Sequence, residues 1–228
     1  MNYREAAAML GSPDVEGRVA HMYLDSKGKV TVGVGQLLPS ASIAAEYPFF
    51  LGAGKPSQAS MSGSTAGGAV PAMSNGGTGI TVGRRATRQE IEAEFRKVKA
   101  LTPNLPARWY GKHTTLVLKE EEITALLFKR IRTFETSLRG VFHEWDKFPA
   151  SAQLALLDLQ YNTGSVASKF PSLTRAAKAH DWARCAIECH RAPPVGAKRN
   201  LNTRLLFLQA AQIDKLSLRS ASGAGVHR

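Results

Sequence analysis

The stretch that decides the fold is residues 16–35, EGRVAHMYLDSKGKVTVGVG. From Met22 onward apolar residues alternate with small or polar ones, and Ser26-Lys27-Gly28 is a turn signal, so the pattern predicts a β-hairpin. One face of its second strand is aliphatic. The other carries little beyond the Thr31 hydroxyl, which lets a bulky ligand approach the backbone closely. A plain hairpin in which Asp25 merely starts the turn explains the same pattern.

Two carboxylates belong to this stretch, Glu16 before the hairpin and Asp25 at its turn. If Asp25 pairs with Lys29, Thr31 is its diagonal neighbour on the same face. Glycoside hydrolysis generally needs one carboxylic acid to protonate the leaving oxygen and a second carboxylate across the bond. Glu16, among apolar neighbours, is the better acid, and Asp25, in a polar turn, is the better ionised partner. The spacing alone has low specificity, because two acids nine residues apart can be accidental.

The composition is that of a globular protein with a basic surface. The 30 Lys and Arg residues outnumber the 18 Asp and Glu residues, which gives a net charge of +12. Such a charge attracts nucleic acid, anionic membranes or the acidic polymers of a bacterial envelope, or simply keeps the chain soluble. No run of about 18 apolar residues predicts a membrane span, and the N-terminus lacks a signal-peptide pattern, so synthesis in the cytoplasm is expected.

Two cysteines, Cys185 and Cys189, are four residues apart on a predicted helix. This spacing favours two reduced, partly buried thiols over a disulfide framework. His190 is adjacent, but no second cluster offers further ligands, so we expect no metal site and no cofactor.

The rest of the chain predicts mainly helices. Capping-box patterns open two of them, one running from Asn2 through Leu10 and one spanning 87–102. Further helices are predicted at 119–140, 149–164, 166–179, 181–191 and 197–216. The helix at 149–164 is apolar on most sides, which predicts a buried centre for an α-helical lobe.

The expected fold class is therefore α+β, with one catalytic domain over residues 1–216. It would comprise a small hairpin lobe (1–50), an insertion (51–113) and a larger helical lobe with its leading helix (114–216). The first part of the insertion, 51–86, is rich in Gly and Ser, which predicts a flexible loop or, alternatively, a mobile flap over the site. Residues 217–228 form a basic tail that we expect to be disordered.

The string E-G-x₇-D-x₅-T-x-G-x-G, built from Glu16-Gly17, Asp25, Thr31, Gly33 and Gly35, resembles the active-site region of the T-even-phage-type lysozymes, glycoside hydrolase family 24. Other segments are also similar to that family: Tyr23, Leu37-Leu38, ALLDLQYNTG at 155–164, 170–173, Trp182 and 197–203. The resemblance covers roughly 2–38 and 115–210 and leaves 39–113 largely as an insertion. It implies a lysozyme-like two-lobe fold.

The resemblance also implies an endo-acting muramidase that cleaves the β-1,4 bond between N-acetylmuramic acid and N-acetylglucosamine in peptidoglycan and lyses the cell wall. Glu16 would be the general acid and Asp25 the catalytic carboxylate, while Thr31 would hold the attacking water. Family members of this type invert the anomeric centre, which fits carboxyls about 6.5–9.5 Å apart. Three residues would line the cleft, with ordinary packing as the alternative for each: Leu37, Tyr161 and Ser172.

Two positions depart from the family pattern. Many relatives have His where this chain has Gln36, so a structural ion pair is expected to be absent. The basic residue that relatives bring near the catalytic acid falls close to Gly196, and Lys198 or Arg199 could take its place.

The expected substrate is the glycan strands of peptidoglycan, bound by a monomer without membrane insertion or specific nucleic-acid binding. A cytoplasmic chain would reach the wall through a holin pore, a phage tail or a secretion system. That delivery machinery and an inhibitor or immunity protein are the candidate partners. One alternative is a non-catalytic peptidoglycan-binding protein that keeps the lysozyme fold. Another is a nucleic-acid binder, suggested by charge but by no recognition motif.

Overall fold

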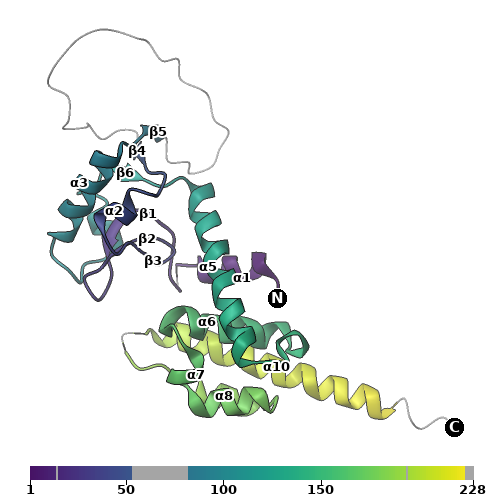
Figure 1. Ribbon diagram of the computed structural model, residues 1–228. Helices are drawn as coiled ribbons and strands as arrows, with labels where there is room; N and C mark the ends of the chain where they lie inside the picture. Colours follow the sequence, from purple (N-terminus) through teal and green to yellow (C-terminus); the bar gives the residue numbers. More distant parts are fainter. Residues whose placement is uncertain (14, 53–81, 194, 224–228) are drawn as a thin grey trace, which may run out of the picture. The chain divides into compact units, whose positions relative to one another are not determined.

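A computed structural model describes residues 1–13, 15–52, 82–193 and 195–223 (Figure 1). Over these residues the protein is mixed α+β, with ten α-helices and two antiparallel sheets of three strands each, which confirms the expected fold class. The chain forms two compact units, which are described one at a time. The sheet unit is Arg18–Leu126, and the helical unit combines Met1–Gly17 with Leu127–Arg228.

The predicted hairpin is the first sheet of the sheet unit. Strand β1 (Val19–Leu24) pairs with β2 (Val30–Gly33), which pairs in turn with β3 (Gln36–Leu37). The backbone N–H of Asp25 donates to the carbonyl of Lys29 at 2.9 Å, so the Asp25–Lys29 pairing, which was a condition of the sequence prediction, is present. Gly28 closes the turn with a φ of +65°, a conformation that favours glycine.

A second sheet in the same unit was not predicted. Its central strand β4 (Phe50–Gly52) lies between β5 (Val82–Arg85) and β6 (Leu116–Val117). Both ends of the stretch 51–86 are therefore paired strands, and the prediction of a wholly flexible loop is wrong there, because these backbone groups satisfy one another across the ladder. Residues 53–81, where a loop or flap was expected, lie outside the described residues.

Three helices lie wholly in the sheet unit: α2 (Ala41–Ala44), α3 (Arg88–Lys99) and α4 (Ala107–Tyr110). The predicted capping box of α3 is confirmed, since the Thr87 hydroxyl accepts from the Glu90 backbone N–H while the Glu90 carboxylate accepts from that of Thr87. The helix ends at Lys99, three residues before the predicted end.

Glu94 connects α3 to β6 through a buried carboxylate. It accepts hydrogen bonds from the backbone N–H of Thr115 at 2.7 Å and of Leu116 at 2.9 Å, and from the Thr115 hydroxyl at 2.7 Å. We expect Glu94→Gln to lower the free energy of unfolding by about 1–3 kcal/mol, because an amide N–H₂ would face a backbone donor. Urea unfolding would measure the loss. The matched change Glu92→Gln, at a more exposed position on α3, should cost less than about 1 kcal/mol, and equal costs for the two would contradict this role.

The helical unit is built around α6 (Ala150–Thr163), whose residues from Ser151 to Tyr161 are all buried. The predicted C-terminal signal is confirmed, since Gly164 caps the helix with a φ of +80°. The other members are α1 (Tyr3–Leu10), the part of α5 (Glu120–Val141) from Leu127 onward, a short 3-10 helix (Trp145–Lys147), α7 (Val166–Lys169), α8 (Pro171–Lys178), α9 (Trp182–Glu188) and α10 (Ala197–Gly223). Helix α10 packs against both α6 and α9.

Three helix boundaries in this unit differ from the prediction. The single helix expected over 166–179 is broken before Pro171, because proline has no backbone N–H to donate and is favoured at the first position of a new helix. Helix α9 ends at Glu188 rather than at residue 191. Helix α10 continues to Gly223, so the expected disordered tail is helical over 217–223. Residues 224–228 of that tail lie outside the described part.

The cysteines behave as predicted. Cys185 and Cys189 are free and buried, and burial raises the pKa of the Cys185 thiol to about 12. Within the described ranges, His, Cys, Asp and Glu side chains form no group of three that could hold a metal ion. None of the helices described has the length and apolar character needed to span a bilayer.

Candidate active site

The six residues predicted for the site divide equally between the two units. Three lie in the helical unit: Glu16, Tyr161 and Ser172. The other three lie in the sheet unit, where the first sheet brings them together: Asp25, Thr31 and Leu37.

Glu16 sits at the end of a tight loop that follows α1. Its backbone N–H donates to the Leu10 carbonyl at 3.3 Å, and the next residue, Gly17, donates to Ser12 at 3.0 Å. Gly17 has a φ of +71°, and no atom of the described residues, its chain neighbours aside, lies within 4 Å of the position that a Cβ would occupy. Backbone conformation rather than lack of space therefore favours glycine after the acid. The Glu16 side chain is 21% exposed.

Arg199, from the first turn of α10, holds the Glu16 carboxyl. Its Nη1 donates to Glu16 Oε1 at 2.8 Å and to the Val15 carbonyl at 3.3 Å. Its Nε and Nη2 both donate to Asp158 Oδ1, at 2.9 and 2.7 Å. The planar guanidinium thus joins a surface carboxyl to a buried one and fixes the orientation of both.

Asp158 is the centre of this network and comes from the buried helix α6. Its Oδ2 accepts from the Thr203 hydroxyl at 2.6 Å and lies 2.8 Å from Arg191 Nη1. That ion pair is outside hydrogen-bond geometry, but Arg191 also donates through Nη2 to the Thr203 hydroxyl at 2.6 Å. Asn200 completes the network, since its Oδ1 accepts from Arg191 Nε at 3.0 Å and its Nδ2 donates to the Arg191 carbonyl at 2.8 Å.

The charges of this ionic cluster, Glu16, Asp158, Arg191 and Arg199, balance. Burial acts to lower the pKa of both arginines. At Arg199 the carboxylates of Asp158 and Glu16 outweigh burial, so its pKa is raised. At Arg191 burial prevails over the attraction of Asp158, and the pKa is lowered from a high starting value. Removing charges from water costs several kcal/mol for each ion. Such a cluster is therefore poorly explained by stability alone, and its contact with the loop includes the hydrogen bond from Arg199 to the Glu16 carboxyl.

In the sheet unit, Asp25 and Thr31 lie on one face of the hairpin. Asp25 Oδ1 accepts from the backbone N–H groups of Lys27 and Lys29, each at 2.8 Å, which is the polar, hydrogen-bonded environment that the turn predicted. The buried Thr31 hydroxyl donates to the Lys29 carbonyl at 3.1 Å. Thr31 pairs directly with Leu37 on β3, so the exposed Leu37 side chain shares this face.

The glycines of the motif have a structural reason of their own. Gly33 and Gly35 have φ values of +65° and +63°. The backbone conformation alone therefore explains why glycine occupies both positions, because glycine adopts a positive φ without strain. Close approach of a ligand, the reason considered from the sequence, is compatible with this but is not required by it.

The two predicted cleft residues of the helical unit have packing partners. The buried Tyr161 ring lies edge-to-face with Phe134 at 5.4 Å between centroids, and the Arg130 guanidinium lies 4.4 Å from its centroid. The half-buried Ser172 hydroxyl accepts from Arg175 at 3.4 Å. For both residues a contact with substrate stays a prediction.

The two departures from the family pattern have different outcomes. Gln36 donates from Nε2 to the Leu37 carbonyl at 3.0 Å, a local contact rather than an ion pair. Beyond its two chain neighbours, Gly196 has no atom within 4 Å of a Cβ position among the residues that the structure describes. Of the two basic residues proposed in its place, Arg199 contacts Glu16, whereas Lys198 is exposed at the surface.

Four residues of the cluster and its surroundings were not predicted as functional: Asp158, Arg191, Asn200 and Thr203. One signal was available, since Asp158 is a lone carboxylate in the apolar run ALLDLQY, and a carboxylate in a buried helix requires a partner. The residues near Asp158 in the sequence do not indicate that its partners are Arg191 and Arg199.

A scan of protein-family models gives no match to this chain, and a search of curated proteins gives none either.

Proposed function

We propose that the chain is a peptidoglycan hydrolase that cleaves the β-1,4 bond between N-acetylmuramic acid and N-acetylglucosamine. Within this proposal it is a T-even-phage-type lysozyme with the two-lobe fold of that family. The observation that carries the proposal is the hydrogen bond from Arg199 to Glu16, supported from behind by buried Asp158. This arrangement orients the Glu16 carboxyl, which lies on a loop. It requires the burial of three charged groups, those of Asp158, Arg191 and Arg199.

Glu16 is the general acid. Proton transfer requires a carboxyl held in one orientation relative to the leaving oxygen. The hydrogen bond from Arg199 to Glu16 Oε1 supports the role of Glu16 as the acid. The Glu16 proton goes to the glycosidic oxygen as the bond from that oxygen to the anomeric carbon breaks.

Asp25 is the second carboxylate and acts on the water. Two backbone N–H groups donate to its Oδ1, which supports an ionised form. In an inverting reaction Asp25 accepts a proton from the water that attacks the anomeric carbon. The Thr31 hydroxyl oxygen, on the same face, helps to hold that water.

The net charge of +12 is compatible with this substrate, since the wall polymers are acidic. It does not select among anionic partners by itself, so the test has to detect the bond that is cleaved.

Purified sacculi should release soluble muropeptides that end in a reducing N-acetylmuramic acid, which borohydride converts to N-acetylmuramitol for detection by mass spectrometry. Asp25→Asn should remove nearly all of this release, because the amide oxygen can still accept from the turn while the base is lost. Glu46→Gln, an exposed carboxylate change in the same unit, should behave as wild type.

Two results would count against the proposal. Sedimentation with sacculi without new reducing ends would favour the non-catalytic wall-binding protein. Release of peptides without sugar ends would indicate cleavage of a different bond.

A further inference from the structure

The hairpin face that carries Asp25 and Thr31 also carries a lysine. The β1–β2 register pairs Leu24 with Val30, so the next pair toward the turn is Asp25 with Lys29, joined by the backbone hydrogen bond of 2.9 Å. Residues directly opposite each other in an antiparallel pair have their Cβ atoms on the same face, about 4.5–5.5 Å apart. Lys29 is exposed. A cation therefore lies beside the two groups to which we assign the attacking water.

Asp25 does not neutralise this cation. Its carboxylate turns back over the turn, where Oδ1 accepts from the backbone N–H groups of Lys27 and Lys29. Within the described part of the chain, the Lys29 ammonium takes part in no ion pair or hydrogen bond. Asp25 is also the one carboxylate in residues 18–45, so the sequence around the hairpin supplies no other counter-ion.

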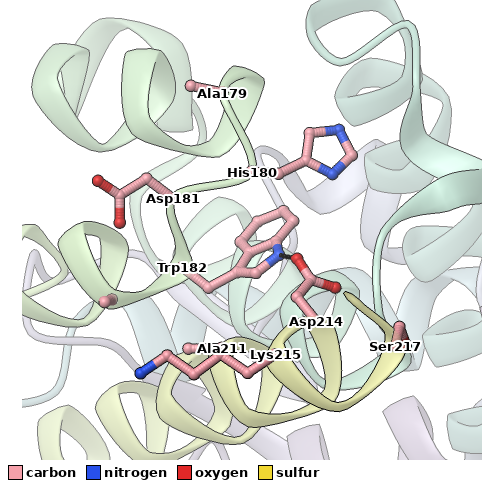
Figure 2. A pocket seen from close by; sticks show the side chains of 9 residues that line it. Ala179, His180, Asp181, Trp182, Ala211, Asp214, Lys215 and Ser217 are labelled. Atoms are coloured by element: carbon pink, nitrogen blue, oxygen red, sulfur yellow. Dashed lines mark hydrogen bonds between the residues drawn. The ribbon is translucent and has the colours of Figure 1, made fainter. Parts of the chain in front are cut away.

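Lys215, in the helical unit, shows the contrasting arrangement. It lines a cavity of about 520 Å³ beside α9 and the C-terminal part of α10, and Asp181 and Asp214 line the same cavity (Figure 2). Asp214 also accepts from the Trp182 indole N–H at 2.5 Å. Carboxylates of the protein itself accompany this lysine, and a lining of both signs selects no particular ligand.

Further positive charge gathers at the hairpin turn. Lys99, the last residue of α3, donates from Nζ to the Gly28 carbonyl at 2.7 Å, and Lys27 is exposed on the turn itself. A local excess of one sign attracts ligands of the other. The turn is therefore suited to a ligand that brings a negative group close to Asp25.

We propose that Lys29 binds a carboxylate of the peptide attached to the N-acetylmuramic acid whose glycosidic bond is cleaved. This inference rests on the proposed function, in which the water activated by Asp25 attacks the anomeric carbon of that sugar. The sugar would then lie against the hairpin face, and its peptide leaves from a neighbouring position of the same ring. Both sugars are uncharged, and the lactyl group is amide-linked to the peptide. The negative charges of the substrate nearest to the reacting carbon are therefore the carboxylates of the peptide.

The test uses purified sacculi without attached phosphate polymers, before and after their free carboxyls are converted to primary amides with carbodiimide and ammonia. Co-sedimentation at low temperature gives the dissociation constant. Lys29→Met should weaken binding to the untreated sacculi about threefold, as expected for one exposed ion pair, and leave binding to the amidated sacculi unchanged. Lys29→Arg should bind both preparations as the wild type does, because a guanidinium also binds carboxylates.

Hydrolysis provides a second readout. A contact made equally in the ground state and the transition state changes KM and leaves kcat unaltered. Lys29→Met should therefore raise the substrate concentration at half-maximal rate about threefold on untreated sacculi, with the maximal rate unchanged.

Lys97→Met is the matched control, because it removes the same charge from an exposed lysine of the sheet unit. Lys97 precedes Lys99 by two residues, which places it about 200° around α3 from that side chain. It should bind both preparations as the wild type does. An equal loss for Lys97→Met, an equal loss for Lys29→Met on amidated sacculi, or no loss for Lys29→Met would each overturn the proposal. A wild-type protein that releases no reducing ends, but whose binding depends on Lys29 as described, would count against the proposed cleavage and not against this contact.

Discussion

Replacing Glu16 with glutamine is expected to lower the rate of peptidoglycan hydrolysis by about 10²–10⁴-fold, the usual contribution of a general acid. The amide oxygen of the new side chain can still accept from Arg199, so the contact of 2.8 Å persists while the transferable proton is lost. The measurement is the rate at which soluble reducing ends appear from purified sacculi.

The control for this experiment is Glu5→Gln. Glu5 is an exposed carboxylate in the first turn of α1, in the same unit as Glu16, and the protein with this substitution should hydrolyse sacculi at the wild-type rate. Both variants should show the same thermal unfolding as the wild type to within a few degrees. A Glu16→Gln protein that is folded and fully active would remove Glu16 from the role of acid.

Asp158→Ala is expected to lower the free energy of unfolding by about 3–5 kcal/mol. The change would leave Arg191 and Arg199, both buried, without the carboxylate that accepts from Arg199 at 2.7 Å and lies 2.8 Å from Arg191. An uncompensated buried charge costs more than the lost hydrogen bonds themselves. Urea unfolding followed by far-UV circular dichroism at neutral pH would measure the difference.

Asp146→Ala provides the comparison for a surface pair. Asp146 pairs with Arg139 at 2.7 Å, but its side chain is 75% exposed and the pair is screened by solvent, so its removal should cost far less than the removal of Asp158. If Asp158→Ala proved as mild as this, the cluster would not be the buried, mutually dependent group that the distances indicate.

A further variant separates stability from orientation. Replacing Asp158, Arg191 and Arg199 together by Leu, Met and Met should restore much of the stability, because apolar replacement of a buried ion cluster is often neutral or favourable. The same protein should hydrolyse sacculi poorly, since nothing then holds the Glu16 carboxyl. Full activity in this variant would show that the cluster has no part in positioning the acid.

Much of the local structure was predictable because its causes lie within a few residues. The Asn2 cap of α1, the Thr87–Glu90 capping box and the turn at Gly28 each depend on side chains or backbone preferences of adjacent residues. The break before Pro171 belongs to the same class and was missed, although proline carried the signal.

The second sheet could not be predicted in this way. Strands β4, β5 and β6 are only two to four residues long, which is too short for an alternating pattern to stand out. Strand β4 pairs with one segment that lies thirty or more residues further along the chain and with another that lies more than sixty residues further. Only the packing of the unit decides which of several short segments is paired.

The sequence by itself determined the hairpin that presents Asp25 and Thr31, because alternation and turn chemistry are local properties, and the family resemblance of its motif named Glu16, Asp25 and Thr31 as the candidates. Tertiary structure alone decided that Arg199 rather than Lys198 holds Glu16, and that Asp158 and Arg191 support it. Arg199 is 41 residues from Asp158 and 183 from Glu16. Arg199 and Asp158 meet because α10 packs against α6. A charge that this packing buries requires an oppositely charged partner, and the fold rather than the local sequence determines which residue that is.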